Sequence, residues 1–555
     1  MAGSAAPHTI ARPVLAFVSY ETAYSPCGGI SAVLARLPNR VAAAASMPTV
    51  VITPFHHRLP KTATLDVSWV GQCGVNFDGR LVVVHIHRHS GPAPHYFLRP
   101  EDPAFFAGMR HPYDVDGATL QRDSLFFGAA VWRALATIAP GARWTLLLQD
   151  WETATVALAC AGQTSRPRMF LTLHNSYDCV APHSRLRDAG FAPHACPGET
   201  VLQRALGVCE WPVFTVSDQF ARDLVEDPFQ SQVLAPHLAP LLASRLVGVD
   251  NGPFTDLAVP LPLLEQAAAG SPEALLAWKR EKLRGFLTAL DGLKPGDDRP
   301  LWGDLAQFRR DESPLFVMAG RDDCRQKGYD VAARAAELCL QDDVAARFVF
   351  FPIPGDEGLP GLEFLKQLAG RFPQQVLVFP FRFAEGFLNA LQGATCGIMP
   401  SLYEPFGMAN EFYLNGTIGI GRATGGILQQ IVPVAQSRSY NPAVASRAAR
   451  VHPAGLAETG FLFRERDGLH SEVDDWRGLN STEYLTPGAP FDRVHDRLRF
   501  ALYGSMVDEL AGALRDAVDL ASSPTSYAAL LTAGIRHIQS TLSWDRAAQG
   551  YLRYV

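Results

Sequence analysis

The chain lacks an excess of positive charge and lacks long apolar runs. Its 49 lysines and arginines stand against 55 aspartates and glutamates, which gives a formal net charge of −6. A nucleic-acid partner bound by bulk electrostatics needs a basic surface, so we expect none. The most apolar stretches, such as 41–55, fall short of the ~20 consecutive residues that a membrane-spanning helix needs. An anionic small molecule in a local pocket stays compatible with this charge balance.

Paired cysteines are also missing. The nine cysteines stand singly, without a C-x-x-C pair, and this pattern fits free thiols in a reducing compartment better than a disulfide framework or a zinc site. Residues 1–13 have no basic start followed by a long apolar core, so we expect no secretory signal. We therefore expect a soluble, cytoplasmic protein that does not span a membrane. Its oligomeric state stays open.

What the chain does contain is apolar sequence for more than one core. It has 555 residues, of which 48% are hydrophobic and 19% are charged. A single core rarely grows beyond about 250–300 residues. The length therefore predicts two domains of roughly 200–250 residues each, plus connections.

Short apolar runs alternate with helix-like runs in both halves. We expect strands at 13–20, 49–55, 81–87, 143–150, 168–174, 212–217, 314–320, 347–353, 375–381, 396–401 and 417–422. Several runs are apolar almost throughout, as are strands buried on both faces of a parallel sheet. The alternation predicts the α/β class, with two Rossmann-like doubly wound domains that face each other across a cleft. Ligands are expected at the carboxyl ends of the strands.

A stretch with proline, glycine and aspartate separates the two halves. We predict an N-terminal domain at 12–255, a linker or hinge region at 256–312, a C-terminal domain at 313–525 and a final segment at 526–555. The polar, irregular region 470–495 is expected to be an insertion or a mobile loop.

Two Gly-Gly pairs follow strands in the two halves. Gly28 and Gly29 lie between the first strand and its helix, and Gly425 and Gly426 take the corresponding place in the second half. Glycine permits a tight turn, and the first N–H groups of the following helix can bind an anion. An isolated pair is explained at least as well by a plain turn. Two pairs together predict loops that bracket a diphosphate-sugar.

Charged residues follow two strands of the second half. Arg321 and Lys327 lie on either side of a short acidic stretch, where fixed cations would stabilise the negative charge of a leaving nucleotide diphosphate. A solvated charged loop is the alternative. Glu404 can accept hydrogen bonds from sugar hydroxyls, and Gly407 permits close approach of a ligand to backbone amides. Glu411, one helical turn further, is better explained as a surface charge.

Polar residues also end two strands of the first half. His174 and Asn175 follow one strand, and Asp150, Trp151 and Glu152 follow another. Carboxylates beside an aromatic ring suit a carbohydrate, because the ring stacks on sugar C–H groups while the carboxylates accept from hydroxyls. A lone histidine is more often structural than catalytic, and an ordinary strand end explains the acidic pair equally well.

Taken together, these segments resemble the bacterial glycogen/starch synthase family of retaining glycosyltransferases, which has the GT-B fold. The resemblance covers roughly residues 13–255 and 313–553. It rests on FVSYETAYSPCGGISAVLARLP (17–38), QDWET (149–153), LTLHN (171–175), FTVS (214–217), RDDCRQKGYD (321–330), PSLYEPFGM (400–408), GTIGIGRATGGI (416–427) and TGFLF (459–463).

The resemblance implies transfer of glucose, or a related hexose, from ADP- or UDP-glucose to a glucan or other glycan acceptor, with retention and without a metal or other cofactor. The N-terminal domain would lie on the acceptor side, the C-terminal domain would bind the nucleotide-sugar, and the last helix would cross back to the N-terminal domain. The implied catalytic residues are Arg321, Lys327, Glu404, His174 and Asp150. The implied donor-binding residues are Gly28, Gly29, Gly407, Met408, Thr424, Gly425 and Gly426.

This chain departs from the family pattern at several positions. The family lysine before Gly-Gly is absent, and Pro26 and Cys27 occupy that region. Gln149 and Glu152 replace two histidines around the Asp-Trp pair, and Phe406 replaces a cysteine. The donor base, the sugar and the acceptor therefore stay open. The alternatives are a transferase that adds a single sugar to a small molecule, a lipid or a surface polysaccharide, and a catalytically impaired glycan-binding or regulatory relative.

Overall fold

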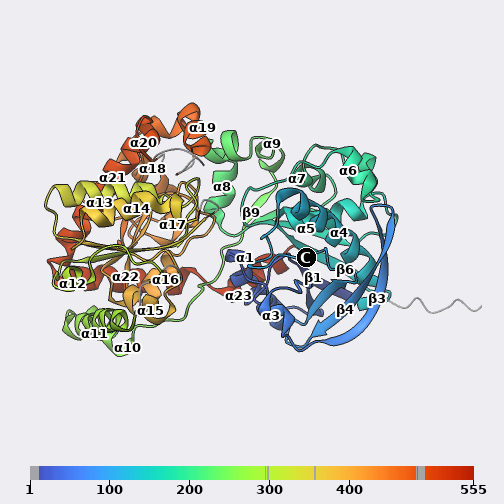
Figure 1. Ribbon diagram of the computed structural model, residues 1–555, viewed down its shortest axis with the longest axis horizontal. Helices are drawn as coiled ribbons and strands as arrows, with labels where there is room; N and C mark the ends of the chain where they lie inside the picture. The colour runs from blue at the N-terminus through green and yellow to red at the C-terminus, as the bar shows by residue number, and fades with distance from the viewer. Residues whose placement is uncertain (1–11, 294–295, 297–298, 356–357, 483, 485–493) are drawn as a thin grey trace, which may run out of the picture. The chain divides into compact units, whose positions relative to one another are not determined.

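The structure is a computed structural model that describes residues 12–293, 296, 299–355, 358–482, 484 and 494–555 (Figure 1). The chain divides into two compact units. Unit 1 contains the described residues up to Val225, together with Leu234–Gly252 and Ser543–Val555. Unit 2 contains Glu226–Val233 and the described residues of Pro253–Leu542. The short segment 226–233 thus lies in unit 2, although the chain on both sides of it lies in unit 1.

Unit 1 is built on a nine-stranded sheet with the order β3-β4-β5-β2-β1-β6-β7-β8-β9. Its strands are β1 (Pro13–Val18), β2 (Thr49–Pro54), β3 (Ser68–Phe77), β4 (Arg80–His89), β5 (His95–Pro100), β6 (Arg143–Gln149), β7 (Arg168–Leu173), β8 (Val213–Thr215) and β9 (Leu246–Gly248). The pairings from β5 through β2 to β9 are parallel, and the continuous apolar runs of β1 and β6 are buried as predicted.

The region around the predicted strand 81–87 is antiparallel, unlike the rest of the sheet. β4 pairs antiparallel with both β3 and β5, and the sequence prediction contained neither of these two strands. The sequence did not predict β3 because Gly71 and Gly74 interrupt its hydrophobic pattern. Gly71 has a packing reason: a Cβ there would lie 2.7 Å from the Cγ2 of Thr137 in the helix beneath.

Two central helices of unit 1 pack against each other without intervening side chains at one point. Helix α4 (Gly117–Ile138) begins at Asp116, whose carboxylate accepts from the backbone N–H groups of Ala118 and Thr119. Such an N-cap contributes about 1 kcal/mol. At Gly128 the backbone of α5 (Asp150–Cys160) comes so close that a Cβ would lie 2.6 Å from Thr155. The pair therefore positions the first turn of α5.

The remaining helices of unit 1 cover the sheet and its edges. They are α1 (Gly29–Leu34), α2 (Leu37–Ala44), α3 (Pro60–Ala63), α6 (His183–Asp188), α7 (Val201–Leu206), α8 (Asp218–Glu226), whose last residue belongs to unit 2, α9 (Ala239–Leu242) and the C-terminal α23 (Trp544–Leu552). α23 packs on α2. Its Tyr551 is buried, with the ring centroid 4.6 Å from that of Phe214 in β8.

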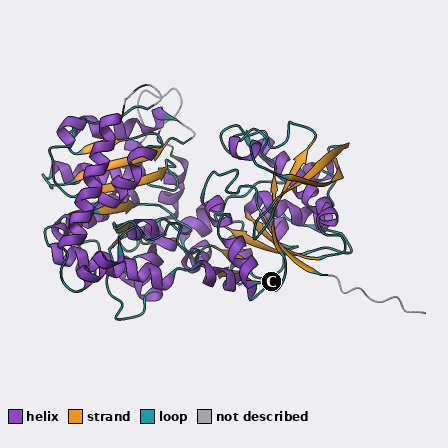
Figure 2. Ribbon diagram, turned by 90° about the horizontal axis from the view of Figure 1, so that it is seen from below, coloured by secondary structure: helices purple, strands orange, loops and turns teal. Residues whose placement is uncertain are grey.

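Unit 2 is built on a six-stranded sheet, all parallel, with the order β12-β11-β10-β13-β14-β15. Its strands are β10 (Leu315–Arg321), β11 (Arg347–Ile353), β12 (Val376–Val378), β13 (Cys396–Met399), β14 (Ile418–Arg422) and β15 (Phe461–Phe463). Helices cover both faces of this sheet (Figure 2). The carboxyl ends of β10, β13 and β14 carry the motifs of the second half.

The helices of unit 2 include a group that precedes its first strand. They are α10 (Leu261–Ala268), α11 (Glu273–Ala289), α12 (Leu305–Phe308), α13 (Tyr329–Gln341), α14 (Glu363–Arg371), α15 (Ala384–Gly393), α16 (Ala409–Leu414), α17 (Gly425–Gln430), α18 (Pro442–Val451), α19 (Val473–Ser481), α20 (Val494–Arg497), α21 (Ala501–Ala521) and α22 (Pro524–Thr541). Along the described residues, none of the helices in either unit is both long and apolar enough to cross a membrane.

The stretch 256–312, expected to be a linker or hinge, is packed into unit 2. Phe286 of α11 is fully buried in a core cluster with residues of β10, β11 and β12. Lys279 is also buried, and its ammonium donates to the carbonyl oxygens of Gln392, Ala394 and Gly416. Helix α11 is thus part of the core of unit 2, and its charged surface residues concealed this role in the sequence.

The region 470–495 is partly helical, in contrast to the irregular loop expected from its polarity. Trp476 of α19 is fully buried, and its ring stacks on Phe229 at 4.6 Å between centroids. Phe229 belongs to the segment 226–233, so this contact helps to hold that segment in unit 2. Residues 483 and 485–493 lie outside the described residues.

Candidate functional site

In unit 2, the loop that follows β13 is joined to the loop that follows β10. The buried carboxylate of Glu404 accepts from the Lys327 ammonium at 2.7 Å and from the Ser401 hydroxyl at 2.9 Å. The backbone N–H of Leu402 donates to the Gln326 carbonyl at 2.7 Å. Two motifs that are far apart in the sequence therefore form one structure at the carboxyl edge of the sheet.

The Gly-Gly pair of this unit packs directly against the same loop. The N–H of Gly426 donates to the Glu404 carbonyl at 3.1 Å. A Cβ at Gly425, where φ is +44°, would lie 1.8 Å from that carbonyl oxygen, and one at Gly426 would lie 2.1 Å from the Phe406 oxygen. Gly407 also has a positive φ of +81°. Glycine is thus required at these positions for backbone contact, beyond any role in turning the chain.

Two buried amide side chains hold the ends of this loop. Gln430 of α17 donates from its Nε2 to the Phe406 carbonyl at 2.6 Å, and its Oε1 accepts from the backbone N–H of Asn410 at 2.7 Å. The Asn410 Nδ2 donates to the Gly407 carbonyl at 3.1 Å. Sequence reasoning missed both residues, although an amide on an otherwise apolar helix face beside a motif is a usable signal.

A buried ion pair supports the other side of the loop. Arg422 at the end of β14 binds the Glu465 carboxylate with two N–H groups, at 2.7 and 2.9 Å, and donates a third to the Leu402 carbonyl. Burial alone would raise the pKa of Glu465, but Arg422 and Arg464 outweigh it and lower the pKa to about 2. The pair stays ionised, and its bidentate geometry fixes the backbone just before Glu404.

The other predicted residues of this unit lie around the same edge. Arg321 is the exposed last residue of β10. Met408 and Thr424 are the residues that directly precede α16 and α17, and Thr424 is buried. The predicted residues at this edge thus comprise the cations Arg321 and Lys327, the carboxylate Glu404, and a loop whose backbone is held at close range.

In unit 1, Asp150 begins α5 with a positive φ of +60°, a conformation that residues other than glycine rarely adopt. Its carboxyl group accepts from the backbone N–H of His174 at 2.6 Å and from the Asn175 amide at 2.9 Å. Burial raises the pKa of Asp150 to about 8, although the hydrogen bonds to these two residues act in the opposite direction. Strain of this kind often occurs where a side chain must hold one orientation.

His174 is positioned by the residue that precedes Asp150. The His174 Nε2 lies 2.8 Å from the Gln149 side-chain oxygen, and because that oxygen only accepts, Nε2 carries the proton. Burial lowers the pKa of His174 to about 3, so the imidazole is neutral at pH 7. It can take part in hydrogen bonds but does not supply positive charge.

The Gly28–Gly29 loop differs from its expected role as an open anion site. The buried carboxylate of Glu21 already accepts from the backbone N–H of Gly28 at 3.0 Å and from that of Ser31 at 2.7 Å. An incoming anion would have to displace this carboxylate from the Gly28 amide, and the donor-binding role of Gly28 stays a prediction. No heavy atom lies within 4 Å of a Cβ built on Gly29, so packing does not require glycine there.

Glu21 belongs to a group of buried acidic residues that sequence reasoning did not assemble. Burial, Asp150 and Glu21 raise the pKa of Glu152 well above its usual range. Burial, Glu21, Glu152 and Asp150 also raise the pKa of Tyr113. The raised pKa values of Asp150 and Glu152 favour their protonated forms, which both donate and accept hydrogen bonds and so suit hydroxyl-rich ligands.

Comparisons with known proteins agree with these motifs. The family model described as "Family 4 Glycosyltransferase in conflict systems" matches residues 275–411. A glycogen synthase of Dechloromonas aromatica is 31% identical over 303 residues, which are 52% of this chain and 56% of that protein. A glycogen synthase of Kosmotoga olearia is 26% identical over 347 residues, 59% of this chain and 64% of that protein. The chain thus spans less than two thirds of the length of either relative.

A solved structure extends the likeness to the whole fold. The catalytic domain of starch synthase IV from Arabidopsis thaliana, bound to ADP and acarbose, aligns with a TM-score of 0.60 and 18% identity, covering 95% of this chain and 100% of that one. The chain is glycogen/starch synthase-like and has the GT-B fold. The predicted resemblance and the predicted fold class are therefore confirmed.

In this GT-B chain the predicted residues fall into separate groups. Lys327, Glu404, Gly407 and the pair Gly425–Gly426 come together in unit 2 through hydrogen bonds or close packing. His174 comes together with Asp150 in unit 1 through one hydrogen bond. The Gly28 amide instead donates to Glu21, an acidic residue at a strand end. The sequence signal for this contact was the glutamate that opens the motif ETAYSPCGG.

Proposed function

We propose that the chain is a retaining hexosyltransferase that moves glucose or a related hexose from ADP- or UDP-glucose to a glucan or other glycan acceptor. The observation that carries the proposal is the Lys327–Glu404 pair, packed against the Gly425–Gly426 loop. The glycogen synthase relatives support the same reaction class. In this proposal unit 2 binds the donor and unit 1 binds the acceptor.

Lys327 and Arg321 would bind the diphosphate of the donor. The Lys327 ammonium has three N–H donors, and Glu404 accepts one of them. The remaining donors can reach phosphate oxygens. Cations that meet developing negative charge stabilise the transition state more than the ground state.

Glu404 and the backbone around it would hold the transferred sugar. The carboxylate is acceptor-only, which suits sugar hydroxyls. The glycines at 425 and 426 let the start of α17 pack directly on the backbone of Glu404 and Phe406, which fixes the loop that carries the carboxylate. The buried supports at Arg422 and Gln430 keep this loop in one conformation, as a preorganised site requires.

The reaction needs no dedicated carboxylate base. The bond between the sugar C1 and the phosphate oxygen breaks, and a new bond forms between C1 and the acceptor hydroxyl oxygen on the same face. The hydroxyl proton passes to an oxygen of the leaving diphosphate, so the products are the extended glycan and a nucleoside diphosphate. Asp150, held by His174 and Asn175, would orient the acceptor hydroxyls.

The single-residue test is Lys327→Ala, assayed by nucleotide release from ADP- and UDP-glucose with a glucan acceptor. Loss of one such electrostatic contact costs about 3 kcal/mol, so we expect turnover to fall about a hundredfold or more with an unchanged melting temperature. The matched control is Lys366→Ala, because Lys366 is an exposed lysine of α14. An unchanged rate in Lys327→Ala would refute the assignment.

Further measurements separate the alternatives. If the protein releases nucleotide from none of the donors, with or without an acceptor, the result favours a glycan-binding or regulatory protein. Product sizing distinguishes one added sugar from a growing glucan. Thermal shift with ADP and UDP identifies the base, because a bound ligand raises the melting temperature by mass action. We also propose a cytoplasmic location, which the nine free cysteines support.

A further inference from the structure

A pocket lies in unit 1, outside the motif residues. It has a volume of about 420 Å³ and is lined by Phe55, His57, Trp69, His85, His87, Arg99, Pro100, Glu101 and Pro103. These residues come from β3, β4 and β5 and from the loops that follow β2 and β5. In the strand order they lie on the opposite side of β2 from β6 and β7, which carry Asp150 and His174.

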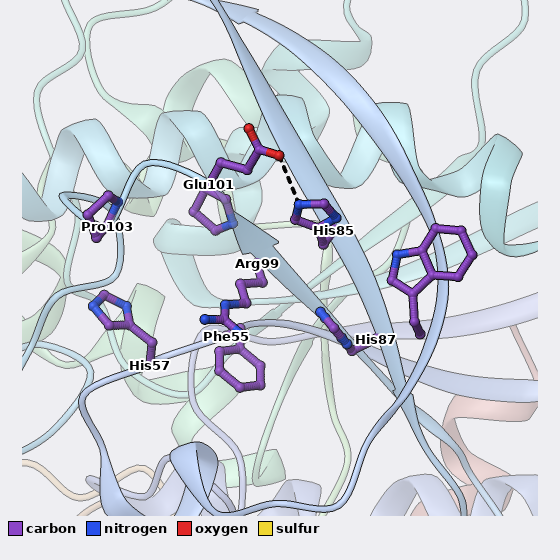
Figure 3. A pocket seen from close by; sticks show the side chains of 9 residues that line it. Phe55, His57, His85, His87, Arg99, Glu101 and Pro103 are labelled. Carbon is purple, nitrogen blue, oxygen red and sulfur yellow. Dashed lines mark hydrogen bonds and ion pairs between the residues drawn. The ribbon is translucent and has the colours of Figure 1, made fainter.

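The floor of the pocket is a guanidinium group without an acidic partner. Arg99 lies over the Phe55 ring, with its Cζ 5.3 Å from the ring centroid. Figure 3 shows it between the His57 and His87 side chains. The carboxylate in the pocket, Glu101, is paired with His85 at 3.0 Å. Among the described residues, Arg99 has no hydrogen bond or ion pair.

The strand register explains why these groups share one face. His85 pairs with Arg99 of β5, and His87 pairs with Trp69 of β3. Directly paired residues point to the same side of a sheet, and alternate residues of a strand do so too. The intervening Val84 and Ile86 are fully buried on the other face. The sequence H-I-H in β4 therefore presents two imidazoles beside one arginine.

The cationic surroundings of His57 and His87 favour the binding of an anion. Burial, Arg58 and Arg99 lower the pKa of His57. Burial, Arg99 and His85 lower the pKa of His87. Within the described parts of the chain, no three His, Cys, Asp or Glu side chains gather closely enough to ligate a metal ion. Added negative charge would relieve the repulsion between Arg99 and protonated imidazoles.

The wall of the pocket adds a flat apolar surface. The Trp69 side chain is 63% exposed although it lies in a β-strand. An exposed indole beside an arginine can stack on the ring of a ligand whose charged group binds below it. We propose that this pocket binds a small ligand that carries a phosphate or carboxylate group on a sugar-sized ring. Such a ligand would occupy a site separate from the donor and acceptor sites of the proposed transferase.

The first experiment follows binding at the pocket itself. Histidines are modified with diethyl pyrocarbonate, and the modification rates of His57 and His87 are read by peptide mass mapping. Glucose 1-phosphate, inorganic phosphate, glucuronate and neutral glucose serve as probes. We expect the first three to slow modification and glucose to have no effect, and the phosphate and glucuronate arms identify the preferred anion. Equal protection by neutral glucose would overturn the proposal.

Variants test which groups bind the anion. Arg99→Gln should weaken binding about tenfold or more, because it removes the charged fork. Arg88→Gln is the matched control on β4, since Arg88 occupies the alternate register and contacts Ser90. Trp69→Ala should weaken the binding of glucose 1-phosphate more than the binding of inorganic phosphate. Binding to Arg99→Gln at the level of the unaltered protein would contradict the assignment.

The pH dependence of binding is a further test. The titratable and charged groups that line the site are His57 from the loop after β2, His85 and His87 from β4, Arg99 from β5 and Glu101 from the loop that follows β5, and Arg58 acts on His57. Glucuronate stays ionised between pH 6 and pH 8, so its affinity should rise about threefold or more as the imidazoles gain protons at lower pH. An affinity that is flat or falls toward pH 6 would count against the proposal. These readouts need no turnover, so they stand apart from the test of Lys327.

Discussion

Single residues decide how each half of the candidate site carries charge. Lys327 and Glu404 lie at 2.7 Å and form a partly exposed ion pair. Asp150, in contrast, is buried and His174 is half-buried, and their pKa values are about 8 and about 3. Unit 2 therefore presents fixed charges that suit a diphosphate, whereas unit 1 presents groups that are mostly neutral at pH 7 and suit hydroxyls. The same residue types acquire different chemistry because their burial differs.

At the residue scale we predict how the titration of Asp150 makes the free energy of unfolding depend on pH. Its pKa is about 8 in the folded protein against 3.8 as the ordinary value, so the folded state keeps a proton that the unfolded state loses. The proton on Asp150 stabilises the folded state fully below pH ~4, and this contribution is lost as the pH rises toward 8. It amounts to at most ~1.4 kcal/mol per unit of pKa difference. Asp150→Asn removes the titration, and asparagine tolerates the positive φ.

The measurement is urea unfolding at pH 5 and pH 8. The difference in unfolding free energy between the two pH values should shrink in Asp150→Asn. Asp323→Asn, at a partly exposed carboxylate of unit 2, is the control and should leave the difference unchanged. The same pH difference in Asp150→Asn and in the unaltered protein would show that Asp150 does not titrate in this range.

At the scale of elements, the start of α17 and the loop before α16 form one packed structure. Gly425→Ala would place a Cβ 1.8 Å from the Glu404 carbonyl oxygen at a φ of +44°. Both the clash and the positive φ disfavour alanine, so we expect a loss of about 2 kcal/mol or more of unfolding free energy. Donor binding should weaken with it, since the clash moves the loop that carries Glu404.

The matched control for this change is Gly370→Ala in α14. A Cβ at Gly370 meets nothing within 4 Å and its φ is not positive, so alanine in a helix should be neutral or stabilise by about 0.5–1 kcal/mol. Thermal unfolding of the two variants gives the comparison. A melting temperature for Gly425→Ala within one degree of the unaltered protein would exclude the packing role.

The long apolar strands of the parallel cores could be predicted from sequence, as could β4, whereas its antiparallel partners β3 and β5 could not. β1, β6 and β10 are continuous apolar runs, and such runs are a local signal. β3 contains Gly71 and Gly74, and β5 contains charged and proline residues, so neither shows a clear pattern. Their strand state depends on pairing with β4. The pocket around Arg99 lies on this edge, which is why no motif pointed to it.

At the scale of the whole molecule, the chain does not divide at one linker. Segment 226–233 lies in unit 2 and Ser543–Val555 lies in unit 1. Within unit 2, Asp227 accepts from Arg464 at 2.6 Å and from Arg447 at 2.8 Å. Burial works against its charge, but these arginines outweigh it and lower the pKa of Asp227. Each unit is thus completed by a short segment from a distant part of the sequence.

We predict that the C-terminal segment stabilises unit 1 in particular. Tyr551 is buried against Phe214, and replacing a buried aromatic residue by alanine costs about 3–5 kcal/mol. Tyr551→Ala should therefore lower the stability of unit 1. Tyr554→Ala is the control, because Tyr554 is 40% exposed. Limited proteolysis with fragment mapping should show earlier cleavage within unit 1 in Tyr551→Ala. Cleavage that begins within unit 2 would contradict the prediction.

The sequence by itself determined the α/β class, the resemblance to glycogen and starch synthases, and the motif residues Lys327, Glu404 and Gly425. Each of these depends on local periodicity or on short spacings. Only the tertiary structure decided that Glu21 occupies the Gly28 amide, that α11 belongs to a core, and that Arg99 lies among imidazoles without an acidic partner. These facts depend on contacts between distant residues and on burial, and neither is encoded in any single stretch of the chain.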